Sequence, residues 1–137
     1  MELDLVGNID TIQNKLLDIE ELVPERMSLI KKRLNKKLES LKIEVDQNRF
    51  EQELIYYLEK IDINEEIVRL KNHLNYFKTT LNERQIEKGK KLTFISQEMG
   101  REINTIGSKS NNLPMQQLVV EMKNELEKIK EQLLNVL

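Results

Sequence analysis

Cysteine and tryptophan are absent from the 137-residue sequence, and proline, glycine and aromatic residues are scarce. Without cysteine the chain has no disulfides, no thiolate metal ligands and no cysteine nucleophile. Two prolines and four glycines leave few places at which the chain must turn, which is typical of long helices rather than of a sheet protein. Because aromatic residues make up only 4%, we expect a core of Leu, Ile, Val and Met.

Long apolar runs are also missing. No stretch approaches the ~20 residues that a membrane-spanning helix needs, and the polar start MELDLVGNID does not resemble a signal peptide. The formal net charge is −2, so a role with nucleic acid would depend on local basic patches rather than on an overall positive field. We therefore expect a soluble, cytoplasmic protein that does not act at a membrane.

What the sequence does have is apolar residues at spacings of three and four along most of its length. This pattern predicts an all-α fold, an antiparallel bundle of about five to six helices with long arms. The expected helices cover about 9–22, 24–45, 46–61, 62–81, 90–107 and 114–136. Pro24 is expected to begin the second helix, where its missing N–H costs nothing, and Asp46 and Asp62 are expected N-caps.

Two polar stripes remain on the fourth and fifth expected helices, beside their apolar faces. The first stripe is Glu66, Arg69 and His73, and the second is Glu98, Arg101, Glu102 and Lys109. Their members are spaced mainly three and four apart, so each set lies along one side of its helix. If the two helices pack antiparallel, the stripes are expected to face each other across a groove.

Together these side chains would suit chemistry at a phosphodiester. Carboxylates one helical turn apart, as in Glu98 and Glu102, can bind a hard divalent cation such as Mn²⁺ or Mg²⁺, and Glu66 would be a third ligand. The imidazole of His73, the single histidine, could move a proton to or from an oxygen of the substrate. Arg and Lys side chains would hold the phosphate.

A structural interpretation of the same residues stays open. Glu, Arg and Lys at these spacings form ion pairs on many helix surfaces, and a lone histidine is often a structural hydrogen-bonding group. The run KKRLNKK at 31–37 could follow a phosphate backbone or could be a solvated helix face. Gly100 in the middle of a helix predicts that another helix or a loop crosses close to it.

A resemblance to a known family narrows these alternatives. Three segments resemble the C-terminal half of the YicC/YloC family: DQNRFEQELIYYLEKIDINEEIVRLKNHLNYFKTTL at 46–81, GKKLTFISQEMGREINTIGSKS at 89–110 and VVEMKNELEKIKEQLLNVL at 119–137. The most specific part is the pattern Q-E-x-x-R-E-x-N-T-x-x-S-K. Its positions here are Gln97, Glu98, Arg101, Glu102, Asn104, Thr105, Ser108 and Lys109.

The resemblance implies a bacterial endoribonuclease that cuts RNA, depends on a divalent cation (Mn²⁺ or Mg²⁺) and assembles as a homohexamer. On this basis we expect catalytic roles for Glu98, Glu102, His73 and Glu66, with the three glutamates as metal ligands. The side chains expected to bind RNA are Arg101, Lys109, Arg69, Lys90 and Lys91.

The resemblance also bears on domain organisation. Family members carry a strand-rich N-terminal domain of similar size, and no strand-like stretch precedes Asp46 here. We therefore expect a C-terminal fragment with an added Met1, in which 1–45 is a helical arm or linker and 46–137 is the family's helical domain. The alternative function is a non-catalytic helical module for oligomerisation or RNA binding, whose polar stripes are structural.

Overall fold

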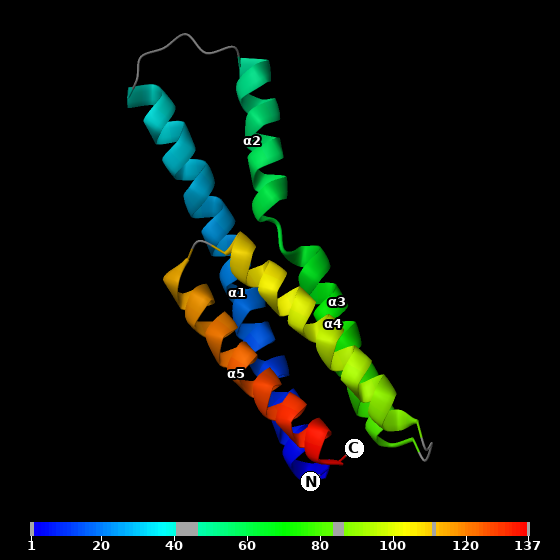
Figure 1. Ribbon diagram of the computed structural model, residues 1–137. Helices are drawn as coiled ribbons and strands as arrows, with labels where there is room; N and C mark the ends of the chain where they lie inside the picture. Colours follow the sequence, from blue (N-terminus) through cyan, green and yellow to red (C-terminus); the bar gives the residue numbers. More distant parts are fainter. Residues whose placement is uncertain (1, 41–46, 84–86, 111, 137) are drawn as a thin grey trace.

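The computed structural model describes residues 2–40, 47–83, 87–110 and 112–136, and every regular element among them is a helix (Figure 1). The five helices are α1 (Glu2–Ser40), α2 (Gln47–Ile61), α3 (Asn64–Leu81), α4 (Lys88–Lys109) and α5 (Leu113–Val136). The all-α class expected from the apolar spacing is therefore confirmed.

Four helical segments form the bundle. The first half of α1 packs against α3 and α5, and α4 also packs against α3 and α5, so the four segments close into a ring. Neighbours around the ring run antiparallel (Figure 1). The second half of α1 and the whole of α2 extend beyond the bundle as a two-helix arm, which we call the arm (Figure 1). One long N-terminal helix thus serves both the bundle and the arm.

The core consists of one apolar stripe from each helix of the ring. Its members are Leu5, Ile9, Ile12, Leu16 and Ile19 of α1, Ile67, Leu70, Leu74, Phe77 and Leu81 of α3, Leu92, Ile95, Met99, Ile103 and Ile106 of α4, and Met115, Val119, Met122, Leu126, Ile129 and Leu133 of α5. The spacing of three and four puts these residues on one face of each helix. Ion pairs such as Lys78–Asp10, at 2.6 Å, line the partly exposed edges, where each adds little stability.

The expected helix boundary at Pro24 is wrong. α1 continues through Pro24 to Ser40, although proline removes one backbone hydrogen bond and disfavours a helix interior. The helix continues because tertiary contacts hold it on both sides of the proline. Ile19 lies in the core, Val23 packs against it, and Arg26 is buried where α4 meets α5. Packing therefore overrides the local signal.

Other boundaries follow the sequence more closely. The expected N-cap at Asp62 is one residue early, because Ile63 is the N-cap of α3 and makes no side-chain cap hydrogen bond; the Asp62 carboxylate does accept a hydrogen bond from the backbone N–H of Asn64 at 2.9 Å. The helix expected over 90–107 is α4, which ends at Lys109. The expected cap at Asp46 and the expected domain boundary beside it lie outside the described residues. The first half of α1 belongs to the same core as the rest of the bundle.

The predicted close crossing at Gly100 is confirmed. A Cβ atom at this position would lie 3.2 Å from Cδ2 of Leu126 on α5. Gly107 is approached still more closely, because a Cβ there would lie 3.0 Å from Cγ1 of Val119. These two glycines let α4 and α5 pack face to face, which turns the opposite side of α4 toward α3.

Alanine at Gly7 and at Gly107 should shift stability in opposite directions. Nothing lies within 4 Å of a Cβ built at Gly7, so Gly7→Ala should add about 1 kcal/mol through helix propensity and raise Tm by roughly 3–5 °C. Gly107→Ala should lower stability by about 1 kcal/mol net, because the stiff, buried Val119 cannot move away without strain. Thermal unfolding followed by circular dichroism measures both, and the same sign for both would contradict this packing.

Candidate functional site

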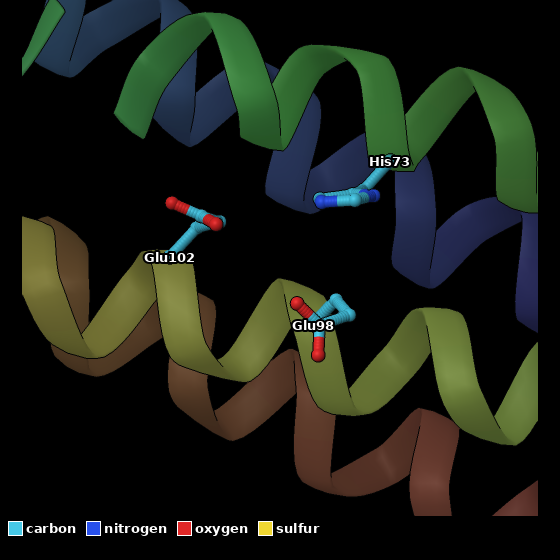
Figure 2. A group of neighbouring side chains, drawn as sticks. All are labelled: His73, Glu98 and Glu102. Carbon is cyan, nitrogen blue, oxygen red and sulfur yellow. The ribbon is translucent and has the colours of Figure 1, made fainter. Parts of the chain in front are cut away.

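The two polar stripes face each other between α3 and α4. Glu66 pairs with Lys109 across the two helices, and His73 extends from α3 toward Glu98 and Glu102 (Figure 2). Both steps, from Glu66 to His73 and from Lys109 back to Glu102, are seven residues long, or two helical turns. One antiparallel register therefore brings Glu66 near Lys109 and His73 near Glu102, so the stripes face each other as the sequence predicted.

The centre of this face is a group of three side chains that we call the His–Glu–Glu cluster: His73, Glu98 and Glu102. One ligand atom from each, a ring nitrogen or a carboxylate oxygen, lies within 4.8 Å of the other two. Figure 2 shows the His73 ring extending from α3 toward the two carboxylates on α4. His73 and Glu98 are half-buried, while Glu102 is only 5% exposed. The apolar residues on either side hold both helix faces in place.

The three groups of the cluster converge without pairing. No hydrogen bond or ion pair joins Glu98, Glu102 or His73 to another side chain among the described residues. Two carboxylates one helical turn apart repel each other. A divalent cation, whose bonds to oxygen and nitrogen are ~2.0–2.6 Å long, can bridge donor atoms up to about twice that distance apart. The donor set and its spacing therefore fit a single divalent cation.

Glu66, expected to be a third glutamate ligand, is placed differently. Its Oε1 accepts a hydrogen bond from Nζ of Lys109 at 2.9 Å, and the Glu66 side chain is 8% exposed. The same ammonium group donates to the carbonyl of Asp62 at 3.3 Å. The structure thus gives Glu66 a cationic partner of its own, and histidine rather than Glu66 stands beside the glutamate pair. The other oxygen of Glu66, Oε2, is buried without a hydrogen bond within the described part of the chain.

The expected RNA-binding side chains are spread around this face. Arg69 pairs with Glu65 on its own helix and is more than half exposed. Arg101 is exposed on α4 between the two cluster glutamates. Lys90 and Lys91 lie in the first turn of α4, about two turns before Glu98, and Lys91 pairs with Glu83 at 3.3 Å. Lys109 makes a direct contact with the α3 stripe through Glu66.

Sequence reasoning missed one charged residue, Arg26. It is 6% exposed, and its Nη2 donates a hydrogen bond to the carbonyl of Lys109 at 2.9 Å, where a cation is favourable at a helix C-terminus. A signal was present, because Arg26 follows Ile19 by seven residues and so continues the buried stripe of α1. The expected break at Pro24 hid that register.

The protein is thus an all-α bundle that presents two carboxylates and an imidazole between one helix pair. Comparison with known proteins makes this specific. Residues 19–137 match the family described as endoribonuclease YicC-like, C-terminal. The chain therefore belongs to the YicC-like family.

Two relatives are both named probable endoribonuclease YicC. The protein from Clostridioides difficile (strain 630) is 39% identical over 136 residues, which cover 97% of this chain and 46% of that protein. The protein from Haemophilus influenzae is 32% identical over 128 residues, covering 93% of this chain and 44% of that protein. The chain thus spans about half the length of these curated relatives.

In the part of the chain that the structure describes, no helix combines the length and the apolar content that a membrane span requires.

Proposed function

We propose that this chain is the helical part of a cytoplasmic endoribonuclease that cleaves RNA phosphodiester bonds, and that the His–Glu–Glu cluster holds the divalent cation used in cleavage. The observation that carries the proposal is the convergence of His73, Glu98 and Glu102 within 4.8 Å without a protein partner. The names of the two relatives support RNA as the substrate.

Each residue of the cluster would have a distinct task. The carboxylates of Glu98 and Glu102 supply hard oxygen ligands and together carry two negative charges. His73 either completes the ligand set through a ring nitrogen or transfers a proton at a substrate oxygen. A nitrogen ligand favours Mn²⁺ over Mg²⁺, which prefers oxygen. When bound, the cation would neutralise charge on the phosphate and polarise its phosphorus–oxygen bonds.

The surrounding cations would position the substrate. Arg101 is exposed beside the cluster on α4, where its guanidinium can hold a phosphate through two parallel hydrogen bonds. Arg69, one turn before His73 on α3, could exchange its exposed Glu65 partner for phosphate at little cost. The net charge of −2 means that binding depends on these local groups.

Cleavage of a mixed pool of single-stranded RNA tests the proposal. We expect cutting in the presence of Mn²⁺ and none after addition of a chelator, with activity restored by excess Mn²⁺. The assay should use the 137-residue chain and, in parallel, a longer protein that contains it, because the relatives named as endoribonucleases are about twice as long. Cleavage that persists in the chelator would contradict the metal-dependent reaction.

Self-association is a second proposed property, and the arm favours it. The apolar stripe of α5 is already buried within its own chain, so it does not require a partner. The arm, however, exposes large apolar side chains, including Leu29 at 49%, Ile55 at 56% and Tyr56 at 61%. We propose that these residues pack against the arms of other copies in a homo-oligomer, for which a hexamer is the expected state.

The arm should control the oligomeric state. Replacing Leu29 and Ile55 by serine removes exposed apolar area from the arm without opening the core, so we expect smaller assemblies and an unchanged thermal midpoint of the bundle. Sedimentation velocity at high micromolar concentration measures this. A strict monomer for the unaltered chain would contradict the proposed assembly.

A further inference from the structure

A second charged site lies where the arm leaves the bundle, away from the His–Glu–Glu cluster. Arg26 is buried there, with one hydrogen bond from Nη2 to the Lys109 carbonyl and a weak contact from Nη1 to the sulfur of Met115 at 4.0 Å. No carboxylate of the described residues forms an ion pair with it. Burial lowers the pKa of Arg26, yet a guanidinium stays charged at neutral pH. A buried charge of this kind normally has an anionic partner.

Arg26 opens into a pocket of about 280 Å³ between the two helices of the arm and the junction of α4 and α5. Besides apolar side chains of α1, the pocket is lined by Arg26, Arg33, Tyr57, Asn112, Leu113 and Pro114, and none of its described lining residues is acidic. Arg33 follows Arg26 by two helical turns, so both guanidinium groups lie on the same side of α1. We call this the arginine pocket.

Two further features suit an anion. The first turn of α5 borders the arginine pocket, and a helix N-terminus carries partial positive charge. Asn112 caps that turn, since its Oδ1 accepts a hydrogen bond from the Met115 N–H at 3.2 Å, which leaves its amide N–H₂ as a donor. Tyr57, at 40% exposure, provides an aromatic ring at the side of the pocket.

We propose that the arginine pocket binds a phosphate of a single-stranded RNA, with a neighbouring base stacked on Tyr57. The fork of a guanidinium group matches the geometry of phosphate, and an aromatic ring beside cationic groups is the usual arrangement for single-stranded nucleic acid. A carboxylate from another protein segment would satisfy one guanidinium but would not use the ring. The identity of the ligand as RNA rests on the proposed function, whereas the preference for a phosphate rests on the pocket itself.

The last two turns of α4 connect the arginine pocket to the cluster. Arg26 contacts the carbonyl of Lys109, and Lys109 lies seven residues after Glu102, or ~10 Å along the helix. An RNA strand held in the pocket would therefore be anchored beside, and not at, the bond that is cut. The arginine pocket is a binding site that the cleavage chemistry does not itself need.

Fluorescence anisotropy of a labelled single-stranded RNA 12-mer, measured in a chelator so that nothing is cut, tests the proposal. Relative to the unaltered chain, Arg33→Gln should raise Kd roughly five- to tenfold. It should also reduce the slope of log Kd against log salt concentration by about 1, the value for one phosphate contact. Tyr57→Leu should raise Kd at least about fivefold through lost stacking. The matched control is Lys123→Gln, which removes one exposed positive charge of α5 outside the pocket and should change Kd less than twofold.

Arg26 itself is tested by Arg26→Lys, with folding checked by circular dichroism, because loss of the fork geometry should weaken RNA binding even where the charge is kept. Kd values for Arg33→Gln and Tyr57→Leu that equal the Lys123→Gln control, or no RNA binding by the chain, would overturn the proposal. If Arg33→Gln binds RNA as before but no longer self-associates, the pocket binds a carboxylate of another protein segment. This outcome would also overturn the proposal. Failure of the proposed cleavage alone would leave these binding results intact, so the two proposals fail separately.

Discussion

Replacing Glu98 or Glu102 with glutamine is expected to abolish metal-dependent RNA cleavage, with a loss of roughly 10³-fold or more. Glutamine keeps the size of the side chain but removes the negative charge that a divalent cation requires. The two carboxylates lie close together and repel each other, so the neutral amide should leave folding unchanged or improve it. A loss of activity would then report on the site rather than on the fold.

The control for this pair is Glu21→Gln, which removes one exposed carboxylate of α1 and should leave cleavage within twofold of the unaltered protein. Circular dichroism and sedimentation should give the same helicity and assembly for all variants. Full cleavage by the double variant Glu98→Gln/Glu102→Gln would exclude the cluster as the catalytic site and leave it a structural feature.

His73→Ala should reduce cleavage at least ~10²-fold, and the mode of rescue separates its two possible tasks. If the ring nitrogen is a metal ligand, excess Mn²⁺ should restore much of the activity. If the ring transfers a proton, added imidazole should restore it and excess Mn²⁺ should not. Unchanged activity of His73→Ala would remove histidine from the mechanism.

The second large effect concerns stability. Lys109→Met should lower the free energy of unfolding by about 2–3 kcal/mol, because it leaves the Glu66 carboxylate buried without its cationic partner. We expect a smaller loss of stability than the largest losses measured for buried ion pairs, since the Lys109 side chain is 31% exposed and solvent screens part of the interaction. Chemical denaturation measures the change.

A double variant decides whether Glu66 is structural. If Glu66 serves mainly to pair with Lys109, Glu66→Gln combined with Lys109→Met should recover at least half of the lost stability and retain cleavage. If Glu66 contributes to catalysis, as the sequence had suggested, the double variant should be stable but inactive, and Lys109→Met alone should still cleave RNA. The two outcomes separate the ion pair from the metal site.

The sequence was most informative where helix periodicity applied. The stripes of α3 and α4 could be predicted residue by residue, because spacings of three and four leave little choice of face. The meeting of His73 with Glu102 required only that the two helices pack antiparallel. Periodicity could not say which glutamate would pair with Lys109. Lys109 extends back from the end of α4 and reaches Glu66, a result of side-chain length rather than of spacing.

The region around Pro24 shows what local signals cannot provide. Proline predicted a break, and only the contacts of Val23 and Arg26 with distant parts of the chain explain why α1 continues. The arginine pocket was hidden for the same reason. Its residues come from α1, α2 and the α4–α5 junction, and nothing in the sequence pattern links those segments.

Diffraction from crystals soaked in Mn²⁺, recorded where manganese scatters anomalously, tests the metal site most directly. We predict one strong anomalous peak from a manganese ion that a ring nitrogen of His73 and carboxylate oxygens of Glu98 and Glu102 coordinate. We predict no such peak in crystals of Glu98→Gln/Glu102→Gln. A protein that cleaves RNA in Mn²⁺ but shows its peak elsewhere, or none between α3 and α4, would contradict the site.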